Sequence, residues 1–358
     1  MTVMMEEIVQ QPTALAGLRK YYESPGAIPL RGLRRLTAHW PPDQVVFTGM
    51  GSSLFTAYPA QAYLTARGIR ATLWETAELL HHHLRILKRD TLLVAVSQSG
   101  ETVEIARLLE QLPPKMRVAA VVNVERSTLG RRGGLLLPMM AGRQTNVSTK
   151  TYMCSVAVLM YLAFAVAGEP HRHLTHALLQ AIHAQERMLD QHELLVVPTV
   201  EFFDHPPYAA LMSRGPDLAS VYQGAMMLKE VARVAAEPIS AAQFRHGPIE
   251  IVNPSHRYVI FARQSPPGVR APRQADTGKL LLKLASDIQS HGGRVLLLTD
   301  LPFPVTANIR SVPVDPLKLG LGTLADALYL QLLAHDLALG AGLEPGSFWI
   351  AEGVTRIE

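Results

Sequence analysis

The strongest constraint on the fold is a repeated alternation of short apolar runs with helical stretches. Each run is rich in Val, Leu and Ala and ends in small or polar residues, which is typical of a strand buried on both faces of a parallel sheet. The alternation predicts βαβ units and an α/β fold. The runs lie at residues 44–48, 91–96, 118–122, 208–212, 258–262 and 294–298, and the helical patterns at 54–67, 103–112, 150–168, 221–235, 278–292 and 319–340.

The order of these signals occurs twice along the chain. The run and turn at 47–52 are echoed at 211–215, those at 92–97 at 258–263, and those at 118–123 at 295–300. A chain of 358 residues also suits two domains of ordinary size. We therefore predict two tandem doubly wound parallel-sheet domains with αβα layers. The expected segments are an N-terminal helical segment (1–30), a first domain (31–170), a helical connector (171–195), a second domain (196–342) and a tail that closes the site (343–358).

Composition narrows the class of partner. A net charge of +4 suits a small anionic substrate, and the basic residues are too scattered to indicate nucleic acid. Cys154 is the single cysteine, which excludes an intrachain disulfide and favours a reducing compartment. The N-terminus has no signal-peptide pattern, and the most apolar stretch is shorter than the ~20 residues of a membrane span. We expect a cytoplasmic protein without a membrane partner.

One turn carries the strongest chemical signal, Ser97-Gln98-Ser99-Gly100-Glu101-Thr102, between a buried strand and a helix. The N-terminus of a helix presents unpaired N–H groups and a positive dipole end, so it attracts anions. The hydroxyl groups add hydrogen-bond donors, and Gly100 permits a tight turn. The carboxyl end of a strand is also where doubly wound folds bind ligands. The turn predicts a phosphate site, and the alternative is an ordinary N-cap.

Three further segments attract attention. Gly49-Met50-Gly51-Ser52-Ser53 repeats the same arrangement after an earlier strand and offers a second set of donors. Asn146-Val147-Ser148-Thr149-Lys150 opens the apolar helix, where Ser148 is a further candidate for the ligand; the alternative is a helix cap with a solvated lysine. His81-His82-His83 has metal-like composition, but neighbouring residues on a helix point in different directions, so we expect no metal site.

Three motifs, in this order, resemble the sugar isomerase (SIS) family: Ser97–Thr102, Val147-Ser148-Thr149-Lys150 and Gln243-Phe244-Arg245-His246-Gly247-Pro248. The resemblance covers nearly the whole chain. It extends to the isomerase half of glucosamine-6-phosphate synthase (glutamine–fructose-6-phosphate aminotransferase) and to stand-alone phosphosugar isomerases and deaminases. It implies two flavodoxin-like SIS domains, a sugar-phosphate substrate, no cofactor, and a homodimer that shares its active sites.

The resemblance also implies roles for individual residues. Glu230 would be the base that moves a proton between C1 and C2, and His246, supplied by the neighbouring subunit, would assist ring opening. Aldose–ketose exchange needs two such groups. Without the resemblance, Glu230 is an ordinary charged residue of an amphipathic helix and His246 a loop histidine. The sugar phosphate would be bound by Ser52, Ser53, Ser97, Gln98, Ser99 and Thr102, with Ser148 as a further candidate.

The sequence also departs from the family. The SIS-like region begins almost at Met1 and Cys154 lies in the apolar helix, so we expect no glutaminase activity. Gln223 and Met227 stand where the synthase has a glutamate and a lysine before the base. The family also has a tail lysine that engages the open-chain sugar, whereas the last lysine here is Lys318.

Two functions therefore remain open. The first is an isomerase or aminosugar-phosphate deaminase that acts on a keto- or amino-hexose 6-phosphate. The second is a sensor that binds a sugar phosphate without turning it over, which the missing lysines favour. The residues before the first strand show no helix-turn-helix pattern, which argues against a DNA-binding regulator.

Overall fold

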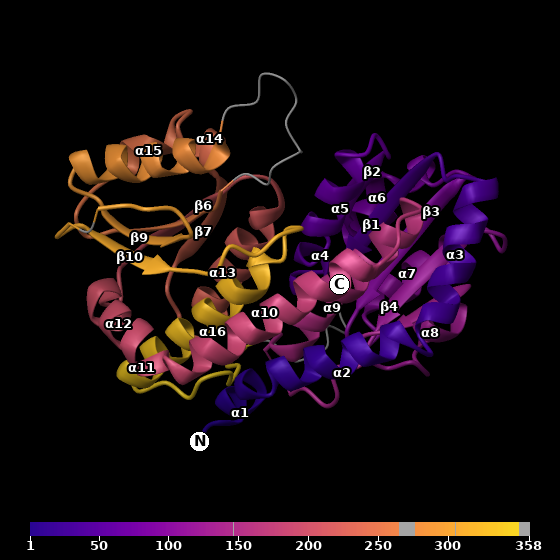
Figure 1. Ribbon diagram of the computed structural model, residues 1–358, viewed down its shortest axis with the longest axis horizontal. Helices are drawn as coiled ribbons and strands as arrows, with labels where there is room; N and C mark the ends of the chain where they lie inside the picture. Colours follow the sequence, from indigo (N-terminus) through magenta and orange to yellow (C-terminus); the bar gives the residue numbers. More distant parts are fainter. Residues whose placement is uncertain (146, 265–275, 305, 351–358) are drawn as a thin grey trace. The chain divides into compact units, whose positions relative to one another are not determined.

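The computed structural model describes all residues except 146, 265–275, 305 and 351–358. The chain divides into two compact units (Figure 1). The N-terminal unit comprises residues 10–182 together with 348–350, and the C-terminal unit comprises residues 1–9 and 183–347. The tail expected to close the site lies largely outside the described residues, at 351–358.

The N-terminal unit is built on a five-stranded sheet in which every pairing is parallel, in the order β2-β1-β3-β4-β5. Side chains alternate between the two faces, as the pleat requires. Leu93 and Ala95 pack with α6, α7 and α8 on one face, while Leu92 and Val94 point to the other. The strands are β1 (Gln44–Gly49), β2 (Ala71–Glu75), β3 (Thr91–Ser97), β4 (Arg117–Val122) and β5 (Leu135–Pro138).

Helix α9 (Lys150–Val166) explains the most apolar stretch of the sequence. All of its residues are buried, because α2, α3 and α5 pack around it in addition to the sheet. No helix among the described residues is long and apolar enough to cross a membrane. The other helices of this unit are α2 (Gln11–Glu23), α3 (Ala27–His39), α4 (Ser52–Phe55), α5 (Tyr58–Thr65), α6 (Thr76–His82), η1 (Leu84–Ile86), α7 (Val103–Gln111) and α8 (Thr128–Arg132), and α10 (Arg172–Asp190) contains the boundary between the units.

The C-terminal unit has a second parallel sheet, in the order β10-β9-β8-β6-β7. Helix α15 covers one face, and α13 with α16 covers the other (Figure 1). The strands are β6 (Ala209–Ser213), β7 (Ala236–Ser240), β8 (Arg257–Ala262), β9 (Arg294–Thr299) and β10 (Ile309–Pro313). The helices are α1 (Val3–Val9), α11 (His192–Leu195), α12 (Val197–Phe203), η2 (Gly215–Asp217), α13 (Leu218–Glu230), α14 (Ala241–Phe244), η3 (Pro248–Ile251), α15 (Thr277–Ser290) and α16 (Gly322–Gly340).

The two sheets have the same topology. In chain order, β6 to β10 occupy the positions that β1 to β5 occupy in the first sheet, so the predicted repeat of elements is confirmed. The strand order reverses between β1 and β3, and again between β6 and β8. At such a switch point the loops after the two strands run to opposite faces of the sheet and leave a crevice at its carboxyl edge.

Two predicted helices differ from the structure, and four strands were not predicted. The expected helix at 54–67 is interrupted and forms α4 and α5, with Pro59 in the first turn of α5. The expected helix at 221–235 ends earlier, at Glu230, because Arg233 adopts a left-handed conformation with φ of 58°. Four strands, β2, β5, β7 and β10, have no counterpart among the predicted runs.

Close packing of α13 makes a first prediction. A Cβ atom on Gly224 would overlap Leu330 Cδ1 of α16 and lie 2.8 Å from Leu211 Cδ2 of β6. We expect Gly224→Ala to lower the free energy of unfolding by about 1–3 kcal/mol through overpacking. The control is Gly17→Ala in α2, where no atom lies within 4 Å of the added carbon and higher helix propensity should raise stability slightly. Urea unfolding midpoints that move the same way in both variants would contradict this packing.

Candidate functional site

The switch point of the N-terminal sheet brings two predicted loops together. Ser52 and Ser53 are the first residues of α4, directly after the short loop that follows β1, and the turn from Ser97 to Thr102 lies at the end of β3. A Cβ atom on Gly49 would lie only 3.0 Å from the carbonyl oxygen of Val96, so the ends of the two strands are closely packed. The two segments that sequence analysis singled out therefore follow neighbouring strands of the sheet.

The turn after β3 is fixed by its own polar groups. Gly100 N donates to Ser97 Oγ over 3.0 Å, and Glu101 N donates to Ser99 Oγ over 3.2 Å. Gly100 has φ of 67°, and a Cβ there would lie 2.6 Å from Ser127 Cβ. No other residue is accommodated without displacing Ser127.

Residues after β4 and at the start of α8 form hydrogen bonds with the turn after β3. The carboxylate of Glu101 accepts hydrogen bonds from Thr128 N and Thr128 Oγ1, each 2.7 Å long. These two bonds lower the pKa of Glu101. Leu129 N donates to Gly100 O over 3.1 Å, and Asn123 N donates to Gln98 O over 3.2 Å. Glu101 is thus a structural member of the turn, and its negative charge is directed at the start of α8.

The beginning of α7 argues against an ordinary N-cap. Thr102 occupies the N-cap position with φ of −62° and ψ of 144°, but its side chain forms no capping hydrogen bond. Thr102 Oγ1 is shielded from solvent and has no partner among the residues that the structure describes. The N-cap side chain therefore leaves the first N–H groups of α7 uncapped.

The start of α9 differs from the expected cap with a solvated lysine. Gln144 Oε1 accepts from Thr149 N at 3.1 Å and from Thr151 N at 2.9 Å, so a glutamine caps the helix. Lys150 is buried, and its Nζ donates to Gln10 Oε1 and to Arg143 O, each at 2.7 Å. Ser148 is half-buried just before this cap.

The two candidate catalytic residues belong to the C-terminal unit. Glu230 is the last residue of α13, and burial raises its pKa to about 7, opposed by the positive charges of Lys229 and Arg233. Arg233 also donates to the carbonyl oxygens of Glu230 and Ser347, the latter over 2.7 Å. His246 lies in the exposed turn after α14, where its N–H donates to Gln243 O over 3.0 Å. Met227 is fully buried in the core.

The switch point of the C-terminal sheet is filled by charged side chains. Arg263 follows β8 directly and forms an ion pair with Asp326 of α16, and its Nε lies 3.9 Å from Asp217 Oδ1. Ser220 Oγ donates to the other oxygen of Asp326 over 2.8 Å. Burial raises the pKa of both carboxyl groups. Sequence analysis missed this cluster; its only local signal was an arginine directly after a buried strand.

The structure also places the run of three histidines and the single cysteine. Neighbouring rings of His81, His82 and His83 have centroids 6.3 Å apart, and His83 packs on Trp74. Within the described part of the chain, no group of three or more His, Cys, Asp or Glu side chains is arranged to hold a metal ion. Cys154 is fully buried in α9, which raises its pKa to about 12.

Comparison with known proteins agrees with this geometry. The SIS domain family model matches residues 40–167. Glutamine–fructose-6-phosphate aminotransferase (isomerizing) of Zymomonas mobilis is 26% identical over 372 residues, covering 95% of this chain but 56% of the relative. The chain thus spans about half the length of such curated relatives.

Solved structures show the same fold. The C-terminal domain of glucosamine-fructose-6-phosphate aminotransferase from Francisella tularensis has a TM-score of 0.82 and 18% identity, with 96% of this chain and 97% of that chain covered. Tagatose-6-phosphate ketose/aldose isomerase from Escherichia coli has a TM-score of 0.77 and 18% identity, covering 98% and 97%. This chain therefore carries an SIS domain, which occupies residues 40–167 and contains both loops of the N-terminal switch point.

Proposed function

We propose that this chain is a phosphosugar isomerase or aminosugar-phosphate deaminase that acts on a keto- or amino-hexose 6-phosphate. The observation that carries the proposal is the uncapped start of α7, framed by the hydroxyl groups of the turn after β3. A phosphate there would accept hydrogen bonds from backbone N–H groups and from Thr102, and the nearby carboxylate of Glu101 is already engaged by Thr128. The names of the relatives support the same class of substrate.

The proposed chemistry uses Glu230 as the base. In the open-chain aldose, its carboxylate takes the proton from C2, the C–H electron pair forms the C1=C2 double bond, and the C1 carbonyl oxygen takes up a proton to give the enediol. Glu230 then returns its proton to C1 while the C2 hydroxyl releases one, so that C2 becomes the carbonyl of the ketose and the protons on oxygen balance. A base with a pKa near neutrality suits this transfer, since it can both accept and release the proton. We assign ring opening to His246, acting as the neighbouring subunit's contribution in a homodimer that shares its sites.

A sensor that binds without turnover is the second candidate. It is favoured by Met227, whose fully buried side chain occupies the position of the synthase lysine. The position of the synthase lysine thus carries no amine that could form a Schiff base with the sugar, although proton transfer by a carboxylate does not require one.

Thr102 tests phosphate binding. Thr102→Val keeps the shape of the side chain and removes the hydroxyl, so we expect the affinity for fructose 6-phosphate and glucosamine 6-phosphate to fall about tenfold or more. Thr65→Val, at an exposed position of α5, is the control and should bind as the unmodified protein does. Isothermal titration calorimetry measures both. Equal dissociation constants for the two variants would place the phosphate elsewhere.

Glu230 tests the reaction. Glu230→Gln should reduce turnover by at least about 10²-fold while sugar-phosphate binding persists, because the amide cannot accept the proton. In the unmodified protein, kcat/KM should fall tenfold per pH unit below about pH 7, as the carboxylate becomes protonated. Release of ammonia and interconversion of hexose 6-phosphates report the two reactions. Binding without turnover of any hexose or aminohexose 6-phosphate would favour the sensor.

The raised pKa also predicts a stability effect that needs no substrate. The folded-state pKa of Glu230 lies above its unfolded value, so its contribution to stability is present at low pH and is lost as pH rises through about 7. Glu230→Gln should therefore raise the melting temperature at pH 8 more than at pH 5. Glu250→Gln, at an exposed position of η3, is the matched control. A difference that does not depend on pH would contradict the buried, ionisable carboxyl.

A further inference from the structure

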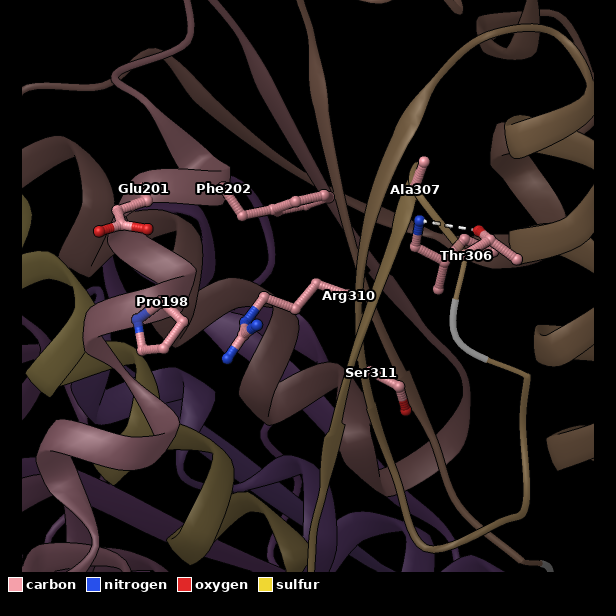
Figure 2. A pocket seen from close by; sticks show the side chains of 8 residues that line it. Pro198, Glu201, Phe202, Thr306, Ala307, Arg310 and Ser311 are labelled. Atoms are coloured by element: carbon pink, nitrogen blue, oxygen red, sulfur yellow. Dashed lines mark hydrogen bonds between the residues drawn. The ribbon is translucent and has the colours of Figure 1, made fainter.

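A hollow of about 500 Å³ lies in the C-terminal unit between α12 and the edge strand β10 (Figure 2). Its walls include Pro198 and Phe202 from α12 and Ile309 and Arg310 from β10. This volume is within the range of small-molecule sites. Because β10 is the outermost strand on the side away from β7, the hollow is separate from α13, which packs on β6 and β7 and ends at Glu230.

Arg310 is held in place by a buried network. Its Nε donates to Thr199 Oγ1 over 2.7 Å. Thr199 is fully buried, and its hydroxyl also bonds to Tyr329 OH at 2.6 Å and to Leu195 O at 3.1 Å. One side of the guanidinium is thereby fixed, so a ligand would not have to order this side chain on binding. In Figure 2 the guanidinium of Arg310 points toward Pro198, whereas the carboxylate of Glu201 points away.

Among the residues that the structure describes, no carboxylate forms an ion pair with Arg310. Two Nη groups in a fixed plane match the oxygen atoms of a phosphate or carboxylate. The guanidinium of Arg310 is therefore a positioned cation that no carboxylate of the described residues pairs with.

A second arginine, Arg294, contacts the ring of Phe202 but does not line the hollow itself. Arg294 begins β9, and its guanidinium carbon lies 4.6 Å from the ring centroid of Phe202, which lines the hollow. Arg257 begins β8 opposite Arg294, and its Nε donates to Phe202 O over 3.0 Å. Arg257 is engaged by further backbone carbonyls, but Arg294 has no ion pair in the part of the chain that the structure describes. Two unneutralised arginines favour a dianion over a singly charged carboxylate.

We propose that this hollow is a second ligand site, which binds the phosphate group of a small organic phosphate monoester to Arg310. The apolar surfaces of Pro198, Phe202 and Ile309 would contact its organic part, and Thr306 and Ser311 line the hollow with hydroxyl groups. The only carboxylate of the lining, Glu201, points away, so the site offers no positioned base and is suited to binding rather than to proton transfer. The inference is independent of the proposed reaction.

The test is the number of phosphate sites in the full chain. Isothermal titration calorimetry with glucose 6-phosphate, AMP and inorganic phosphate should resolve two classes of site, with at least one of the two monoesters occupying the hollow. Arg310→Gln should weaken the second class at least about tenfold and leave the first class unchanged. Thr102→Val should do the reverse. The two monoesters distinguish a sugar phosphate from a nucleotide as the organic part.

Two further variants keep the result decisive. Arg310→Lys retains the positive charge but not the planar fork, and should bind the monoester more weakly than the unmodified protein even if Arg310→Gln fails to fold. Arg70→Gln removes one arginine from an exposed ion pair with Asp43 and should leave both classes intact. If the Arg310 variants keep two sites with unchanged dissociation constants, the proposal is wrong. If the unmodified protein instead lacks only the class of site that depends on Thr102, the result counts against the proposed function and not against this second site.

Discussion

The whole structure depends on the parallel direction of the strands and on the reversal of their order beside the first strand of each sheet. Parallel strands bring every carboxyl end to one edge, and the reversal makes the following loops diverge there. The N–H groups at the starts of the helices that follow these strands need polar partners. The chain meets this requirement in two ways, once in each unit.

In the N-terminal unit the segments at the switch point carry uncharged hydroxyl groups, and the helix α7 that begins there has no side-chain cap. In the C-terminal unit the same place holds two buried carboxyl groups and one guanidinium, contributed by Asp217, Asp326 and Arg263. The two switch points thus share a backbone topology but differ in the charged side chains beside them.

How much of the fold could be predicted follows from where each strand lies. The six runs found in the sequence correspond to β1, β3, β4, β6, β8 and β9, which are covered on both faces and flanked by strands on both sides. The four missed strands, β2, β5, β7 and β10, are the edges of the two sheets. Edge strands are partly exposed and carry polar residues, such as Glu237 in β7 and Arg310 in β10. For β7 and β10 an apolar run is therefore no longer the signature, whereas β5 (Leu135–Pro138) is a short apolar run that sequence analysis did not select.

The sites divide in the same way. The turn from Ser97 to Thr102 was predictable because strand, turn and helix start are adjacent in the sequence. Two other interactions join residues far apart in the chain, so no local sequence pattern predicts them: the Arg263–Asp326 ion pair and the hydrogen bond from Arg310 to Thr199. The identity of Thr102 as an unbonded hydroxyl, rather than a cap, also needed the structure.

The end of α13 shows how local backbone conformation, burial and neighbouring charges together set the pKa of Glu230. The left-handed Arg233 ends the helix, and its guanidinium links the carbonyl oxygens of Glu230 and Ser347. Burial alone would drive the carboxyl toward its neutral form, whereas Arg233 and Lys229 favour the charged form. The opposing effects leave a carboxyl that titrates near pH 7, which is the property a proton-transfer base requires and a purely structural glutamate does not.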